Sequence, residues 1–87
     1  MFREVFDPID ALVTFKPGFP HPRLDAFRWG GRRLDVSNTE RIETARQALY
    51  YVVRALGSRY ALRFDLDRSR WLLEAIDTDD VGNLEDG

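Results

Sequence analysis

The sequence predicts a mainly β domain, a small antiparallel meander that curls into a partly open barrel of five to six strands. Three observations favour this fold. Apolar residues alternate with polar ones along short segments, glycine-containing pairs separate neighbouring segments, and aromatic and β-branched residues are frequent within them. We expect residues 1–76 to form one such domain, because a chain of 87 residues has room for only one.

The first strand is predicted over residues 9–15 (IDALVTF). Its apolar residues recur at every second position, as in a half-buried strand. They are Ile9, Ala11, Val13 and Phe15. The next segment, 16–22 (KPGFPHP), contains three prolines and a glycine, so we expect an irregular connection there.

A β-hairpin is predicted around Gly30 and Gly31, which can adopt the positive φ angles of a two-residue turn. The turn places Trp29 opposite Arg32, Arg28 opposite Arg33, Phe27 opposite Leu34, and Asp25 opposite Val36. One face, expected to be the core side, then carries Phe27, Trp29, Leu34 and Val36. The other face carries Ala26, Arg28, Arg33 and Asp35, although like charges opposite each other destabilise a strand pair.

A second hairpin is predicted from residues 49–56 (LYYVVRAL) and 59–66 (RYALRFDL), with Gly57 and Ser58 as its turn. The resulting apolar pairs are Leu49/Leu66, Tyr51/Phe64, Val53/Leu62 and Ala55/Tyr60. A four-residue loop, 67–70, then leads to a last strand (WLLEAI). In this register Trp71 lies beside Leu66 and Leu73 beside Phe64 on the core side, and Arg63 faces Glu74.

Residues 39–56 allow an alternative, because Ile42, Ala45, Leu49 and Val52 also recur at helical spacing. A helix there would give an α+β fold. The aromatic and β-branched run from Tyr50 to Val53 favours a strand instead, with a loop or a short helical turn over residues 39–47.

Composition narrows the possible environments and partners. The chain has no cysteine, no signal peptide and no apolar run long enough to span a membrane, so we expect a cytoplasmic protein. Residues 1–76 hold thirteen basic and ten acidic residues, whereas residues 77–87 (DTDDVGNLEDG) hold five acids and no base. We expect this acidic tail to be disordered.

Nothing in the sequence has the pattern of a catalytic, metal or cofactor site, so the chain is predicted not to be an enzyme. The only histidine, His21, lies between two prolines, and no cysteine or second histidine can join it. Asp65 and Asp67 could share one face, but Asp67 also suits the start of a turn.

Two surfaces are predicted to bind partners. The first presents Arg28, Arg32 and Arg33 with Trp29 to nucleic acid or another anion, with a cation–π contact between Arg32 and Trp29. The alternative is a protein–protein adaptor or self-associating domain that uses an apolar outer face. That face would contain Tyr50, Val52, Leu72 and Ile76. Nearby acids such as Asp35 could instead neutralise the arginines.

The pattern P-x4-F-x-W-x-G-R-R-x-x-V, from Pro22 to Val36, resembles a small bacterial all-β domain of unknown function. The similarity continues in V-x-A-x-G-x-x-Y-x-L-R-F-D-L-x4-W-x-L-E, from Val53 to Glu74, and covers roughly residues 9–76. Such domains stand alone or lie at the C-terminus of proteins similar to the Y-family, lesion-bypass polymerase relatives of actinobacteria. The resemblance implies a partner in a DNA-repair-type complex, and no particular activity.

Overall fold

The computed structural model describes residues 2–77, which form seven antiparallel strands and no helix. The strands are β1 (Phe2–Thr14), β2 (Arg23–Trp29), β3 (Arg32–Asp35), β4 (Asn38–Ala45), β5 (Ala48–Ala55), β6 (Ser58–Asp65) and β7 (Arg70–Asp77). They make one sheet in the order β3-β2-β1-β7-β6-β5-β4. The predicted mainly β, partly open barrel is confirmed, with seven strands rather than five or six. The acidic segment beyond Asp77 lies outside the described residues.

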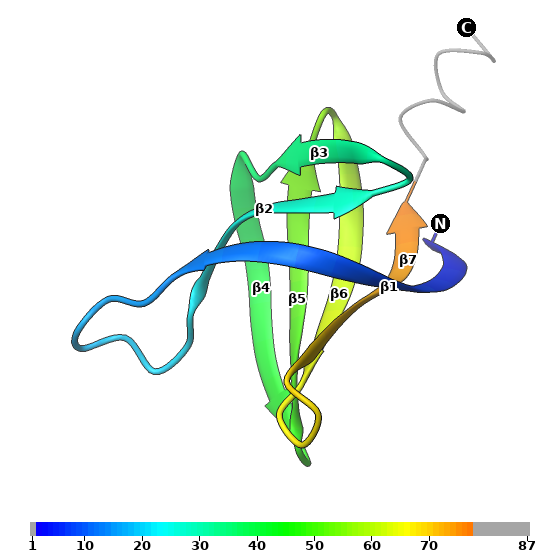
Figure 1. Ribbon diagram of the computed structural model, residues 1–87. Helices are drawn as coiled ribbons and strands as arrows, with labels where there is room; N and C mark the ends of the chain where they lie inside the picture. The colour runs from blue at the N-terminus through cyan, green and yellow to red at the C-terminus, as the bar shows by residue number, and fades with distance from the viewer. Residues whose placement is uncertain (1, 78–87) are drawn as a thin grey trace, which may run out of the picture.

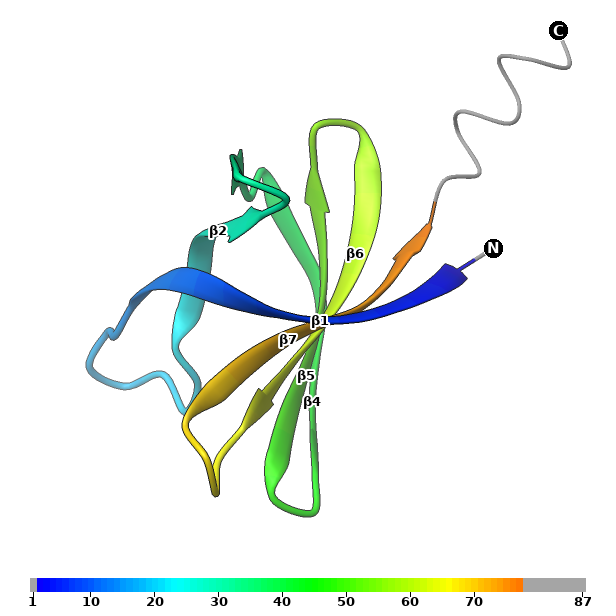
Figure 2. The same ribbon diagram turned by 45° about the vertical axis from the view of Figure 1, so that its right-hand side comes forward.

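The sheet folds over on itself because β1 takes part in two pairings. Its first part, from Phe2 to Ile9, pairs with β7, and its second part, from Asp10 to Thr14, pairs with β2. A register shift near Phe6, where φ is 55°, interrupts the first pairing. As a result β2 and β3 cross the face of β4, β5 and β6 (Figures 1 and 2).

The two edge strands of the sheet, β3 and β4, are consecutive in the chain and are joined only by Val36 and Ser37. The Val36 N–H donates to the carbonyl of Asp25 (2.9 Å), and the Ser37 N–H donates to the carbonyl of Arg54 (2.8 Å). The Ser37 hydroxyl donates to the same carbonyl (3.1 Å). These bonds close the barrel at one corner, whereas the rest of the wall between β2 and β4 stays open.

The core lies between the crossed layers. It contains Leu24, Phe27, Leu34, Leu49, Tyr51, Val53, Ala55, Tyr60, Leu62, Leu73 and Ile76. Tyr51, only 1% exposed, packs its ring 5.1 Å from the ring of Trp71, and its hydroxyl donates to the carbonyl of Pro22 (2.6 Å). Strand β5, the neighbour of the edge strand β4, is thereby tied to the loop that follows β1.

The first hairpin has the predicted register. Trp29 pairs with Arg32, Arg28 with Arg33, and Phe27 with Leu34. Phe27 and Leu34 are buried, and Trp29 and Val36 pack against the core, as expected for that face. The first strand differs at both ends: β1 begins at Phe2 rather than at Ile9 and stops at Thr14, and Phe15 is 77% exposed instead of lying on the core face.

The second hairpin has the predicted faces but another register, because its turn is Leu56–Gly57 rather than Gly57–Ser58. Both turn residues have positive φ, 51° and 81°, and a turn of this kind places glycine at its second position. The observed pairs are Leu49/Phe64, Tyr51/Leu62, Val53/Tyr60 and Ala55/Ser58. A shift of two residues preserves the side on which each residue lies, since the period of a strand is two.

The predicted loop or helical turn over residues 39–47, and the alternative helix over 39–56, are wrong. Asn38–Ala45 forms β4 and pairs with β5 through a turn at residues 46–47. The strand is hard to recognise because it is an edge strand with mostly polar, exposed residues, and the hydrogen bonds to β5 stabilise it.

The last strand also differs from the prediction. Trp71 pairs with Phe64 and Leu73 with Leu62. A register shift after Leu73 turns Ile76 inward, where it is 4% exposed, so its expected place on the outer face is wrong. Arg63 lies opposite Leu72 rather than Glu74, but it still forms an ion pair with Glu74, with Nη1 3.2 Å from Oε2.

We predict that Tyr51→Phe lowers the free energy of unfolding by about 1–2 kcal/mol, because the partly buried carbonyl of Pro22 loses its donor. Denaturant titration of both proteins at pH 7 measures the difference. A variant as stable as the parent would show that this hydrogen bond does not hold the loop.

Tyr51 also predicts a loss of stability in alkali. Burial raises its pKa from 10.0 to about 12. The unfolded chain ionises this tyrosine near pH 10, whereas the folded chain keeps it protonated, so its contribution is complete below pH 10 and is lost as the pH rises toward 12. Tyr51→Phe should therefore show a smaller decrease in unfolding free energy between pH 9 and pH 11. Identical pH profiles would contradict this assignment.

Candidate functional site

The free side of β4 is an unpaired strand edge of eight residues at one end of the sheet. Antiparallel partners alternate between hydrogen-bonded and non-hydrogen-bonded pairs, and the two-residue turn makes Ala45–Ala48 a hydrogen-bonded pair. Glu43 and Arg41 therefore bond to β5 as well. It follows that Ile42 and Thr44 direct their N–H and C=O groups away from β5, toward the open side.

A cleft of about 550 Å³ lies beside this edge, where β4 and β2 diverge below the closed corner. Ile42 faces this cleft from β4 and is 37% exposed, although it lies opposite the buried Tyr51. The lining residues are Thr14, Lys16, Phe19, His21, Pro22, Arg23, Leu24, Asp25, Val36, Ser37, Asn38, Thr39 and Ile42. The opening thus gives access to the inner face of the barrel.

Asp25 is the one acidic side chain in this lining. It accepts hydrogen bonds from the hydroxyl of Thr14 and, at 2.8 Å, from Nε of Arg23. The hydrogen bond from Thr14 lowers the pKa of Asp25, and Arg23 and Lys16 act in the same direction. The carboxylate is therefore held ionised and already partnered, which suits a polar rim better than a proton-transferring group.

A second hollow of about 480 Å³ adjoins the cleft, and both are lined by His21 and Pro22. Its other lining residues are Val13, Phe15, Pro20, Thr44, Leu49, Phe64, Leu66 and Trp71. The loop over residues 15–22 projects from the sheet (Figure 1). Its Phe15 lines this hollow and its Phe19 lines the cleft, and the two side chains are 77% and 67% exposed. Exposed aromatic side chains beside an apolar hollow are typical of a binding surface.

Arg28 and Arg33 lie on the outer face of the first hairpin, as expected, and Arg32, which pairs with Trp29 beside the turn, is exposed as well. Arg33 pairs with Asp35 (Nε–Oδ1 2.8 Å), and both side chains are mostly exposed. Among residues 2–77, Arg28 and Arg32 have no acidic partner within ion-pair distance. Trp29 is turned toward the core, where its indole N–H donates to Asp7 (3.0 Å), so it is not a free stacking surface and Arg32 does not lie on its ring.

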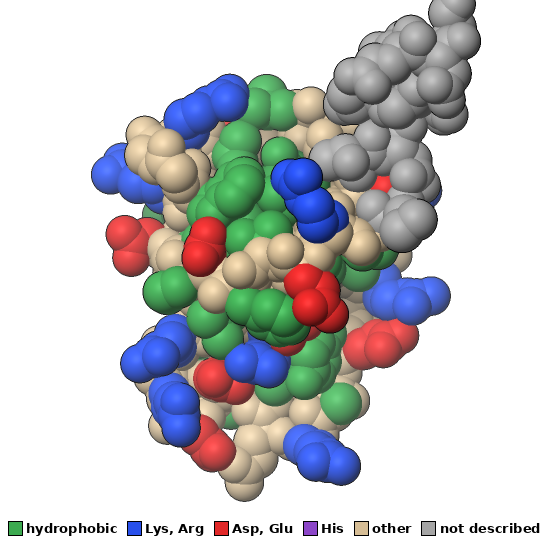
Figure 3. All heavy atoms as spheres, turned by 90° about the vertical axis from the view of Figure 1, so that its right-hand side faces the viewer, with side chains coloured by type: hydrophobic (Ala, Val, Ile, Leu, Met, Phe, Trp, Pro, Cys, Tyr) green, Lys and Arg blue, Asp and Glu red, His purple; other side chains and the backbone are tan. Residues whose placement is uncertain are grey.

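The outer face of β5, β6 and β7 carries three of the four residues predicted for a protein contact. Tyr50, Arg63 and Leu72 follow one another across it, and Val52 lies opposite Ala61. All are partly buried. Seen from the β7 side, hydrophobic side chains form patches between basic and acidic ones (Figure 3). Ile76 does not belong to this face.

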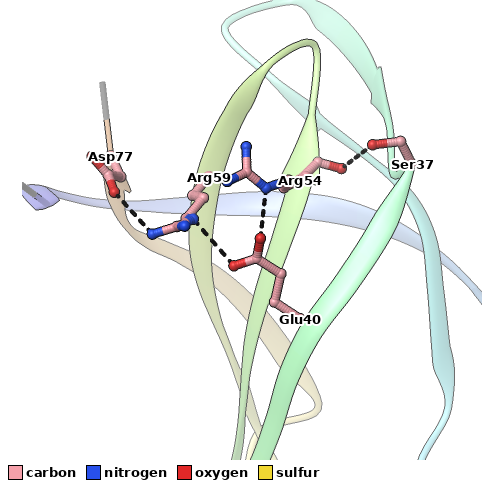
Figure 4. Close-up of polar contacts among 5 residues, drawn as sticks. All are labelled: Ser37, Glu40, Arg54, Arg59 and Asp77. Carbon is pink, nitrogen blue, oxygen red and sulfur yellow. Dashed lines mark hydrogen bonds and ion pairs between the residues drawn. The ribbon is translucent and has the colours of Figure 1, made fainter. Parts of the chain in front are cut away.

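At one end of that face, Glu40 holds two arginines from neighbouring strands. One oxygen of its carboxylate accepts from Nε of Arg54 (2.5 Å), and the other lies 3.1 Å from Nε of Arg59. Arg59 also reaches Asp77 on β7 (3.5 Å) (Figure 4). Glu40 is the extra residue of a bulge in β4, so the network fixes the start of β4 to the sheet.

Within the described part of the chain, no group of three or more histidine, cysteine or acidic side chains is arranged to hold a metal ion. Residues 2–77 also contain no helix that could cross a membrane. A scan against protein-family models, a search of the curated proteins and a search of the solved structures each found no match.

The edge of β4 and the adjoining hollows were not among the sites predicted from the sequence. One signal for β4 was available, since Ile42 and Thr44 are β-branched and alternate with the charged Arg41 and Glu43. The hollows had no such signal, because residues from β1, β2, β4 and the loop meet there only after the barrel has curled.

We predict that Glu40→Gln lowers the free energy of unfolding by about 1–2 kcal/mol, because two partly buried arginines lose their shared carboxylate. Asp35→Asn is the matched control, since it breaks an exposed pair and should cost less than about 0.5 kcal/mol. Thermal or denaturant unfolding of the parent and both variants measures the change in the free energy of unfolding for each substitution. Equal effects would show that the Glu40 network does not stabilise the sheet more than an exposed pair.

Proposed function

We propose that this chain is a non-enzymatic protein-interaction module that binds an extended segment of its partner along the free edge of β4. The observation that carries the proposal is the position of this edge. Unpaired main-chain groups of Ile42 and Thr44 lie directly beside two adjoining hollows.

Strand addition uses the two kinds of contact that this edge offers. Main-chain hydrogen bonds to an edge strand provide affinity, and hollows that accept every second side chain provide specificity. Ile42 and Thr44 line the cleft and the apolar hollow respectively, so a strand added beside them would place apolar side chains over both. Lys16, Arg23 and Asp25 at the rim would meet polar groups of the segment.

The resemblance described for residues 9–76 suggests where this module acts. We propose that it belongs to a cytoplasmic, DNA-repair-type complex. The apolar outer face around Tyr50, Val52 and Leu72 is a less favoured contact surface, because these side chains are already partly buried and their neighbour Arg63 is paired with Glu74.

A second candidate function is the binding of nucleic acid or another anion by the first hairpin. It is favoured by three exposed arginines within six residues, two of them without an acidic partner in residues 2–77. A hollow of about 320 Å³ between Arg28, Arg33 and Asp10 could accept a phosphate edge. Asp10 and Asp35 weaken this proposal, since they offset much of the local positive charge.

Strand addition can be tested by removing one N–H group from the edge. Thr44→Pro removes the N–H that points toward a partner while leaving the hydrogen bonds to β5 in place. Peptides selected by the parent from a displayed random library should bind the variant at least about tenfold more weakly, because one main-chain hydrogen bond is lost and the ring obstructs the edge. Isothermal titration calorimetry measures the affinities.

Thr44→Val is the matched control, since it keeps the N–H and the shape of the side chain and should bind like the parent. Ile42→Lys is a second test that leaves the main chain unchanged and places a charge in the cleft. A ¹H–¹⁵N spectrum confirms that each variant is folded. Strand addition is wrong if folded Thr44→Pro binds the selected peptides as tightly as Thr44→Val.

For the second candidate, Arg28→Glu combined with Arg33→Glu should abolish the binding of short single-stranded or duplex DNA and leave the fold intact. Parent affinity should decrease steeply with salt, because phosphate contacts release counterions. Fluorescence anisotropy at low and moderate salt measures both effects. Undetectable binding by the parent at low salt, or unchanged affinity in the double variant, would exclude an anion site on the hairpin.

A further inference from the structure

We infer that the segment added to β4 is β4 of a second copy of this chain, in an antiparallel pair whose two-fold axis passes Ile42. This inference rests on the proposed strand addition and specifies its partner. Two seven-stranded sheets would then join into one continuous sheet.

Hydrogen-bond direction limits the registers that two β4 edges can adopt. Only residues that direct their main-chain groups outward, such as Ile42 and Thr44, can form hydrogen-bonded pairs with the other copy. In a symmetric antiparallel pair, the axis therefore passes Ile42, Glu43 or Thr44. Charge and length distinguish these three registers.

The axis at Ile42 places Arg41 of each copy opposite Glu43 of the other, so two cross-strand ion pairs form. The axis at Glu43 places the two Glu43 carboxylates opposite each other, which destabilises a strand pair. The axis at Thr44 brings Ile42 opposite the turn residue Arg46, so fewer residues pair. Only the register at Ile42 is both long and complementary in charge.

The side chains involved are available for this pairing. Arg41 and Glu43 are 67% and 60% exposed and lie 3.4 Å apart in a loose ion pair on the outer face. They flank Ile42, whose side chain lies on the opposite face, toward the cleft. In the pair, the four charges would alternate in sign on one face while the two Ile42 side chains meet on the other.

The same charges could instead protect the edge from unwanted pairing, which is a common role of charged residues on edge strands. Protection against a second copy requires like charges to meet in the favoured register. The order Arg41-Ile42-Glu43 does the opposite, because it is complementary to itself when reversed. The other edge strand, β3, has only four residues and is a shorter template.

Sedimentation equilibrium of the full 10.1 kDa chain over a wide concentration range tests the inference. The parent should associate reversibly to twice this mass. Arg41→Glu and Glu43→Arg should each lower the association constant at least about tenfold, because like charges then face each other across the pair.

Mixing these two variants in equal amounts is the decisive step. One copy then presents two acids and the other two bases, so the mixture should regain an association constant within about threefold of the parent value. If Arg41 and Glu43 interacted only within one chain, mixing the two variants would not restore the lost interaction. Arg33→Glu and Asp35→Arg are the matched controls, since they alter an exposed pair with the same spacing on β3 and should leave association unchanged.

The inference is overturned if the parent remains monomeric at millimolar concentration, if the single variants associate like the parent, or if the mixture fails to recover. The peptide experiment separates these outcomes from failure of strand addition itself. A monomeric parent whose selected peptides still require the Thr44 N–H would bind strands of other proteins. A Thr44→Pro variant that keeps both peptide binding and self-association would exclude the edge as the site.

Discussion

The connection between β3 and β4 is the constraint on which the rest of the structure depends. Two residues, Val36 and Ser37, join the two outermost strands of one sheet, so the sheet must curl until its edges meet. Main-chain hydrogen bonds to Asp25 and Arg54 hold Val36 and Ser37 at the corner where the two edges meet. Beyond it, β2 and β4 run in different directions (Figure 1). The cleft lined by residues of both strands gives access to the inner face.

Beside this opening, β4 is firmly held on one side and free on the other. Ser37 and Glu40 fix its first part to β5 and β6, and hydrogen bonds to β5 hold the remainder. The hydroxyl of Tyr51 holds the loop that borders the same opening. The edge and hollows are therefore held in place by these hydrogen bonds and ion pairs before a partner adds a strand, and such preorganisation favours binding.

Alternation and turn chemistry were sufficient to predict the mainly β fold, the first hairpin and the inward faces of most strands. They failed where the structure depends on one-residue irregularities. The bulge in β7 turns Ile76 inward, and the choice of Leu56–Gly57 as a turn shifts a register by two residues. β4 was missed because a polar edge strand is stabilised by its neighbour rather than by its own pattern. The candidate site could not be predicted, since its lining residues come from elements that meet only through the curl of the sheet.

Amide hydrogen exchange along β4, followed by NMR in dilute solution, tests most directly whether this edge is open. The N–H groups of Arg41 and Glu43, which bond to β5, should exchange slowly, whereas those of Ile42 and Thr44 should exchange rapidly. Protection of Ile42 and Thr44 should appear only as the protein concentration increases. Slow exchange of both residues at high dilution would show that the edge is already covered within one chain, and it would contradict strand addition as the basis of function.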